Sequence, residues 1–336
     1  MGVGAAALGV STGGVAATPD ARELSVSGTI SPEVLVFTHF EVGGKTGDFP
    51  GEFQKWYDGY DLTTQISVPG AKTPVYYDPD SGVAATVTGM GKTLCTTSVT
   101  SILASPTFDF ADTFFVSSGI AGSPPSVGTT GSVFVSDYVV DWDLTHRWAQ
   151  EDGHPSLNAS QGNGAGSNGA RSNDDGNGTG NSREYAMTLL PSRPFDYAYE
   201  LNADLVERAA DIGQNVSLTD SDTAKEYRQH YPEETAHRSP FVDVGTTVAG
   251  SEYWHGETFS EQAQYICDLY DAGTYATTEM EDFGTASALR RHGHFDRYLS
   301  IRSVSNFDQP YPGQTIEESL FEADSGGFLP SLTNGY

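Results

Sequence analysis

Cysteine is scarce in this sequence, and histidine is not clustered. The only cysteines among 336 residues are Cys95 and Cys267, which lack the spacing of a zinc site. Two buried free thiols are the simpler expectation, although a bond between the two stays open. The eight histidines are scattered without ligand spacing. We therefore expect neither a metal nor a cofactor.

Basic residues are also few. Lysine and arginine together number 17 against 45 aspartates and glutamates, which gives a net charge of −28. Such a surface repels nucleic acid and anionic lipid, so we expect neither as a partner. Solubility is the simplest consequence of this charge. A high-salt habitat is the expected cause, because salt screens the self-repulsion.

Long apolar runs are missing between Thr18 and Tyr336. A membrane-spanning helix needs about 20 mostly apolar residues, so we expect no transmembrane segment here, and transport would need a separate membrane component. Residues 1–17 are uncharged and rich in Gly and Ala. We predict that residues 1–32 are a secretory signal remnant and a linker, which implies export to the cell surface or beyond. A disordered Gly-rich leader is the alternative.

One internal segment differs in composition from the rest. Residues 150–184 are dominated by Gly, Asn, Ser and Asp, and they cannot bury enough apolar area to offset their ordering entropy. We predict a disordered surface insertion there. The polar motifs described below are spread over residues 41–308 and must converge, so we predict one domain over 33–325, followed by a C-terminal tail at 326–336.

Short apolar runs alternate with helical patterns, which is typical of an α/β fold. The predicted strands are 34–38, 84–88, 113–117, 133–140, 242–248, 273–278 and 298–304. The predicted helices begin near residue 50 and span 93–103, 201–212, 259–269 and 283–292.

The segment Thr277 to Gly313 carries two polar clusters within about one βα unit. The first is Glu279-Met280-Glu281-Asp282 and the second is Ser305-Asn306-Phe307-Asp308, and each follows a predicted strand. Ligands usually bind at the carboxyl ends of strands in open α/β sheets. A Met flanked by carboxylates suits a sugar, and a carboxamide can pair with a heterocycle.

This arrangement resembles the nucleoside phosphorylase and nucleosidase superfamily and, within it, the purine nucleoside permease family. Four further stretches carry the resemblance: FEVGGKTGDFPGEFQKW (40–56), VTGMGK (87–92), SSGIAG with GSVFVSDYVVDWDL (117–144), and GSEYWHGETF (250–259). The resemblance implies a three-layer α/β/α fold of the phosphorylase/hydrolase type with a central mixed, partly barrel-like sheet. It implies a purine nucleoside ligand, phosphate or water as the second reactant, and a homo-oligomer.

The resemblance also implies roles for the pivotal segment. Glu281 is expected to hold the 2′ and 3′ hydroxyls, and Met280 to lie under the ribose. Ser305 and Asn306 are expected to face the purine. Asn306 would act in catalysis by bonding N7, where it can stabilise negative charge that develops on the ring.

Two more segments are expected to contact the base. Gly119 and Ala121 correspond to the floor of the purine site, where small residues let the backbone approach a planar ring. Tyr253 or Trp254 is expected to stack on the base, a contact of about 1–3 kcal/mol. Plain core packing is the alternative for both aromatics.

The second reactant has its own candidate residues. Glu41 is a candidate to activate water, with capping of its loop as the alternative. Lys45, His255 and Arg302 are candidates to bind an anion. Their alternatives are an exposed loop lysine, a satisfied structural histidine and a buried ion pair.

A short glycine motif follows the second predicted strand. Gly89 and Gly91 flank Met90 just before a predicted helix. Such a GxG is expected to form a tight backbone turn under the ligand. A turn that serves packing alone is the alternative.

The sequence therefore leaves three functions open. The first is an exported nucleoside-binding protein that cleaves the N-glycosidic bond. The second is a non-catalytic binder that feeds nucleosides to a membrane transporter. The third is a storage or surface protein that kept the fold and lost the chemistry.

Overall fold

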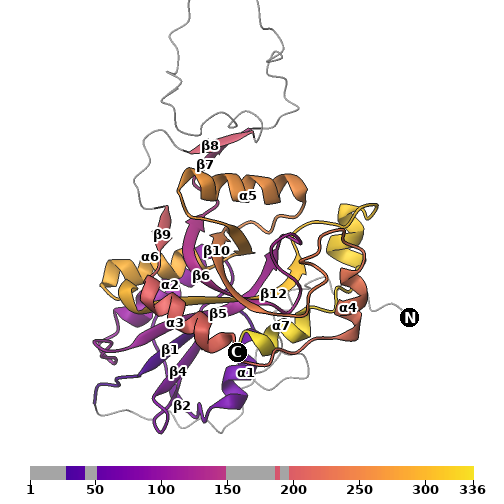
Figure 1. The fold of residues 1–336 in the computed structure, drawn as a ribbon. Coiled ribbons are helices and arrows are strands. Elements are labelled where there is room, and N and C mark those ends of the chain that lie inside the picture. Colours follow the sequence, from indigo (N-terminus) through magenta and orange to yellow (C-terminus); the bar gives the residue numbers. More distant parts are fainter. Residues whose placement is uncertain (1–27, 42–50, 149–185, 190–196) are drawn as a thin grey trace, which may run out of the picture.

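The computed structural model describes residues 28–41, 51–148, 186–189 and 197–336 (Figure 1). The predicted leader and the predicted insertion lie outside these residues. The strands are β1 (Val34–Thr38), β2 (Thr64–Ile66), β3 (Val75–Asp78), β4 (Val83–Val87), β5 (Phe114–Ser123), β6 (Val133–Asp141), β7 (Thr145–Arg147), β8 (Met187–Leu189), β9 (Ala198–Glu200), β10 (Val242–Ala249), β11 (Tyr275–Glu279) and β12 (Tyr298–Phe307). The helices are α1 (Glu52–Gly59), α2 (Lys92–Leu103), α3 (Ala203–Gly213), α4 (Asp222–Arg228), α5 (Glu257–Leu269), α6 (Asp282–His292) and α7 (Phe328–Asn334).

A mixed sheet forms the centre of the fold. Its strand order is β11-β10-β6-β12-β5-β1-β4-β3-β2, and β9 pairs with β6. The pairs β1–β5, β1–β4 and β12–β5 are parallel, whereas β12–β6 is antiparallel. A further bridge between Thr278 and Gly122 joins β11 to β5. This bridge closes five strands into a ring, which confirms the expected mixed, partly barrel-like sheet.

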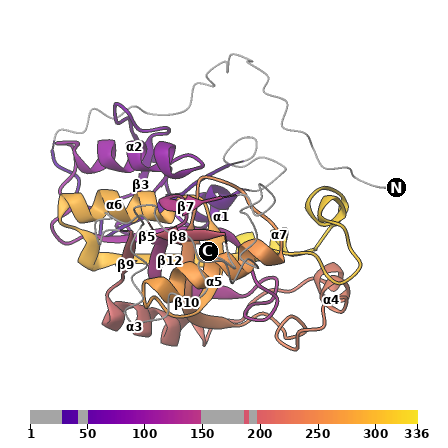
Figure 2. The same ribbon diagram turned by 90° about the horizontal axis from the view of Figure 1, so that it is seen from above.

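Alternating side chains of β1 explain why helices cover both faces of the sheet. Leu35 and Phe37 face one way and join a core with α2 and α6, whereas Val36 faces the other way and packs with Phe53 of α1. Alternation of this kind follows from the two-residue period of a strand. Helices α2 and α6 lie side by side over their face (Figure 2). Both cysteines are buried and free, as expected.

Strand β5 is longer than the sequence pattern predicts. The sequence predicts a strand only at 113–117, followed by the small residues 118–122. Instead, β5 continues to Ser123, because β12 pairs with it in parallel as far as Ser123. The small residues therefore lie inside a strand between two neighbours, and their backbone is held by the sheet.

The C-terminal residues also differ from the expected tail. Phe328–Asn334 form α7, which packs on β12, β5 and α1. The carbonyl of Gly335 accepts a 2.8 Å hydrogen bond from the Ser118 hydroxyl, and the rings of Trp56 and Tyr336 meet at 5.0 Å. Within the described part of the chain, no helix is both long and apolar enough to span a membrane.

Candidate functional site

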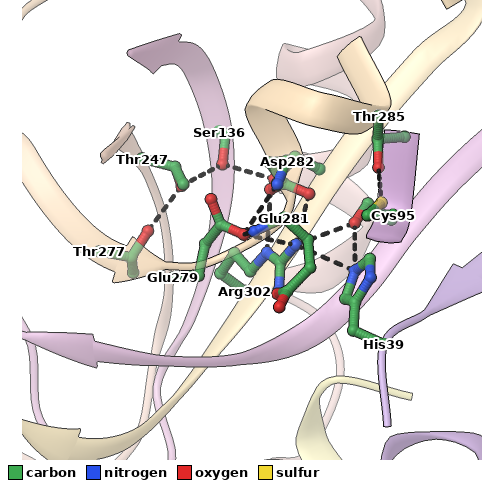
Figure 3. A network of polar contacts seen from close by, with 12 residues as sticks. His39, Cys95, Ser136, Thr247, Thr277, Glu279, Glu281, Asp282, Thr285 and Arg302 are labelled. Carbon is green, nitrogen blue, oxygen red and sulfur yellow. Dashed lines mark hydrogen bonds and ion pairs between the residues drawn. The ribbon is translucent and has the colours of Figure 1, made fainter. Parts of the chain in front are cut away.

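Arg302 lies at the centre of a buried polar network (Figure 3). Its side chain is fully buried in β12, and Nε donates to Asp282 Oδ2 at 2.9 Å. Nη2 also donates to Asp282 Oδ1 and lies 3.0 Å from Glu279 Oε2. The alternative interpretation of this arginine, a buried ion pair, is confirmed. Burial alone would raise the pKa of Asp282, but the Arg302 guanidinium lowers it to about 2.

Four hydroxyl groups form a chain of hydrogen bonds that begins at Asp282 and crosses the closed part of the sheet. The Ser300 hydroxyl donates to Asp282 and lies 2.9 Å from Ser136 Oγ. Ser136 is 2.6 Å from Thr247 Oγ1, which is 2.6 Å from Thr277 Oγ1 (Figure 3). These side chains come from β12, β6, β10 and β11. Buried polar groups need partners, and this chain of hydroxyls satisfies them while fixing Asp282 in place.

Glu281 is held by the GxG turn. Its Oε1 accepts a 2.8 Å hydrogen bond from the Gly91 N–H, and its Oε2 lies 3.9 Å from Arg302 Nη1. Gly89 and Gly91 have φ values of +101° and +84°, which L side chains rarely adopt. Both glycines therefore bend the backbone between β4 and α2, whereas a place of this segment under the ligand stays a prediction. Glu281 is 5% exposed, and burial raises its pKa to about 7. Met280, just before it, is half-buried.

Glu52 is a further buried carboxylate, and sequence reasoning missed it. It is the first residue of α1, and its Oε2 accepts a 2.7 Å hydrogen bond from the His39 N–H. Oε1 accepts from the Ile120 N–H at 2.9 Å. Burial raises the pKa of Glu52 to about 7. The only signal in the sequence is an acidic residue directly after the Gly-rich loop.

Gly119 is the point where these groups meet. A Cβ atom on Gly119 would lie 2.2 Å from Arg302 Nη1 and 2.8 Å from Glu52 Oε1. Glycine is therefore required here, because any side chain would displace the guanidinium. Among the described residues, Arg302 Nη1 has no hydrogen-bond partner. The carboxylates of Glu52 and Glu281 thus both lie near an unused donor.

The residues that follow β1 include two candidates for binding the second reactant, Glu41 and Lys45. Glu41 is half-buried at the end of a described segment and raises the pKa of Tyr76, after the larger effect of burial. Lys45 lies outside the described residues. His39 is buried between the hydroxyls of Thr88 and Ser117, at 2.9 and 3.0 Å, and packs as a structural histidine.

A bulge in β12 sets the other end of the site. The pairing with β5 shifts between Val304 and Asn306, so Asn306 lies opposite Gly122. Bulges commonly re-aim a side chain. The Ser305 hydroxyl donates to Ala121 O at 3.2 Å and to Asn306 Oδ1 at 2.7 Å. Asn306 Nδ2 donates to the Tyr253 hydroxyl at 3.4 Å.

The two neighbouring aromatics separate into different roles. Tyr253 is 61% exposed beside Asn306, whereas Trp254 is 5% exposed and stacks on Trp142 at 5.0 Å. Core packing, the alternative reading, therefore holds for Trp254. His255 is also buried: its Nε2 lies 2.9 Å from Ser319 Oγ, and burial lowers its pKa to about 4. A histidine that is neutral at pH 7 is a poor anion ligand.

The structure therefore brings several of the predicted positions next to one strand, β5. Arg302 and Glu281 lie at the Gly119 end of β5, and Asn306 lies at the Gly122 end. Three strand residues span about 10 Å, which is roughly the length of a nucleoside. No group of three or more His, Cys, Asp or Glu side chains suited to a metal occurs in the described parts of the chain.

Comparison with known proteins identifies the family. Residues 31–336 match the purine nucleoside permease (NUP) family, and the chain belongs to it. A probable purine nucleoside permease of Schizosaccharomyces pombe is 32% identical over 314 residues, covering 90% of this chain and 84% of that protein. A purine nucleoside permease of Candida albicans is 28% identical over 304 residues, covering 85% and 70%.

Solved structures share the fold at low sequence identity. A 5′-methylthioadenosine/S-adenosylhomocysteine nucleosidase of Helicobacter pylori matches with a TM-score of 0.52 and 14% identity, covering 90% of this chain and 94% of that one. The corresponding nucleosidase of Neisseria meningitidis gives a TM-score of 0.50 and 14% identity, covering 91% and 96%. The nucleosidase and phosphorylase type of fold expected from the sequence is confirmed.

Proposed function

We propose that this protein binds a purine nucleoside along β5 and hydrolyses its N-glycosidic bond. The observation that carries the proposal is the meeting of Glu52, Glu281 and Arg302 Nη1 at Gly119, in the same strand as Gly122. The ribose lies at the Gly119 end and the purine at the Gly122 end. Family membership and the nucleosidase-like fold support the choice of ligand.

Glu281 holds the ribose in this proposal. One oxygen is fixed by the Gly91 N–H, and the other faces the site 3.9 Å from Arg302 Nη1. A carboxylate held in this way can accept hydrogen bonds from two vicinal hydroxyls. The half-buried Met280 lies next to it and offers an apolar surface to the ring.

Local charge favours water over phosphate as the second reactant. Arg302 is surrounded by the carboxylates of Asp282, Glu279 and Glu281, and Glu52 lies beside them. A phosphate dianion would enter this acidic surrounding against Coulomb repulsion, whereas a water molecule carries no such cost. The unused Nη1 donor and the Glu52 carboxylate supply a donor and an acceptor for that water.

Glu52 is the general base of this reaction. As the bond from C1′ to the purine breaks, its electron pair goes to the purine, water attacks C1′, and Glu52 takes the proton that water loses. Burial places the pKa of Glu52 at about 7, close to the value that suits a base at neutral pH. Glu52 thus replaces Glu41 as our candidate.

The decisive experiment is incubation of the protein with inosine and adenosine, with and without phosphate, in high salt. We expect free base and free ribose in both conditions. Free base only in the presence of phosphate would instead identify a phosphorylase and overturn the choice of water. Absence of free base under both conditions would overturn cleavage itself.

A second candidate function follows from what the relatives are called. Both fungal proteins are named as permeases, which favours a binder that delivers purine nucleosides to a membrane transporter. Calorimetry on the same samples separates the two functions. Nucleoside binding with no release of base would support the carrier, whereas turnover would support the hydrolase.

A further inference from the structure

Asp308 is a buried acid at the purine end of the site. It follows β12, where its N–H donates to Ser123 O at 3.0 Å and its carbonyl accepts from the Gly256 N–H at 2.7 Å. The residue is 1% exposed. Its Oδ2 accepts a 2.8 Å hydrogen bond from the Tyr275 hydroxyl. Its Oδ1 has no hydrogen-bond partner among the described residues.

Asp308 and Asn306 lie close together beside Gly122, which has no side chain. A Cβ on Gly122 would lie 3.1 Å from Thr278 Cγ2, 3.3 Å from Asn306 Nδ2 and 3.7 Å from Asp308 Cβ. The carboxamide of Asn306 and the Cβ atom of Asp308 therefore border the same spot beside β5. An amide can orient a heterocycle but has no acidic proton to give. Asp308 is the titratable group in position to supply one.

We propose that Asp308 donates a proton to the leaving purine, while Asn306 orients the ring. The inference rests on the hydrolysis proposed above. As the bond from C1′ to N9 breaks, its electron pair enters the purine, and the proton on Asp308 Oδ1 moves to N7. The neutral base leaves, Asp308 remains as a carboxylate, and water from solvent returns the proton.

The surroundings of Asp308 raise its pKa, so that a large fraction of the side chain is protonated near neutral pH. Burial raises its pKa from 3.8 to about 7. The titratable groups that face it are the phenols of Tyr275 on β11, Tyr253 before α5 and Tyr231 after α4. Burial raises the pKa of each phenol, so all three remain neutral while Asp308 titrates. A buried carboxyl that stays neutral at pH 7 can act as an acid.

A pair of substrates tests the proposal in Asp308→Asn. Inosine needs a protonated leaving group, whereas p-nitrophenyl β-D-ribofuranoside releases a stable anion without one. We expect inosine cleavage to fall by about 10²-fold or more, the usual contribution of a general acid. Cleavage of the nitrophenyl riboside should stay within about threefold of wild type. Equal losses on both substrates would show a structural role and overturn the proposal.

A second variant covers the case in which Asp308→Asn damages the fold. Adding Asn306→Asp to Asp308→Asn restores a carboxyl beside Gly122, and we expect inosine cleavage to recover by about tenfold or more. No recovery in a folded double variant would count against a proton donor at this position. A wild-type protein that cleaves the nitrophenyl riboside but not inosine would overturn the role of Asp308 alone. Failure on both substrates would overturn hydrolysis as well.

Discussion

Arg302 donates to both carboxylate oxygens of Asp282, from Nε to Oδ2 and from Nη2 to Oδ1. These two hydrogen bonds fix the guanidinium. Its remaining nitrogen, Nη1, lies next to Gly119. The strand β12 supplies the arginine, and the first turn of α6 supplies the aspartate. The candidate site is therefore built where helix α6 meets strand β12.

Removing the arginine should destabilise the whole domain. Arg302→Leu leaves Asp282 and Glu279 buried without their counter-charge. The loss of one partner from a buried ion pair typically costs about 3–5 kcal/mol. Denaturant unfolding measures this, with the exposed Arg208→Ala in α3 as the matched control. A loss no larger than that of the control would contradict the central role of Arg302.

Binding of nucleoside should depend on Glu281. Glu281→Ala removes the acceptor for two ribose hydroxyls, and hydrogen bonds to charged groups contribute about 1.5–3 kcal/mol each. We expect the affinity for inosine, measured by calorimetry, to fall by about 10²-fold or more. The exposed Glu207→Ala should leave it unchanged. Retained affinity in Glu281→Ala would remove this residue from the site.

Turnover should depend on Glu52 and much less on Glu41. Glu52→Gln keeps the shape of the side chain and removes the base, so kcat should fall by about 10²-fold or more while inosine affinity changes little. In the wild-type protein, kcat should also fall below a pH of about 7, because the Glu52 pKa is raised to about 7 and only the ionised form takes a proton. Glu41→Gln is the matched control. If Glu41→Gln alone abolished turnover, the assignment would return to Glu41.

Stability should depend on pH through Asp308. Its pKa is raised on folding from 3.8 to about 7, so its contribution is complete below about pH 4 and is lost as the pH rises through about 7. Asn does not titrate. The stability of Asp308→Asn relative to wild type should therefore rise between these pH values by about 2–4 kcal/mol. A constant difference in unfolding free energy across this pH range would contradict the raised pKa.

Local sequence patterns predicted much of the fold and, within the site, the Glu279–Asp282 cluster and Arg302. The apolar runs located β1, β4, β6 and β10–β12 within a few residues, and the Glu279–Asp282 cluster marked the sugar end. These signals lie within one element, where strand and helix periods are readable. Arg302 was recognisable because a charged residue inside an apolar strand needs a partner.

Contacts between distant segments explain what the sequence did not reveal. Glu52 is functional in our proposal only because the N–H groups of His39, just after β1, and of Ile120, in β5, hold it beside Gly119. The composition of the loop before it does not specify that path. Similarly, β5 extends to Ser123 because β12 pairs with it, although Ser and Gly disfavour strands. Pairing thus outweighed local propensity.

The contact between Tyr336 and Trp56 has a practical consequence for protein production. The ring of Tyr336 lies against Trp56 of α1, the helix that begins with Glu52. An affinity tag fused directly after Tyr336 would start at this contact and would press on the helix that carries the proposed base. Purified protein with such a tag should therefore be compared with protein from which the tag has been cut before any low activity is interpreted.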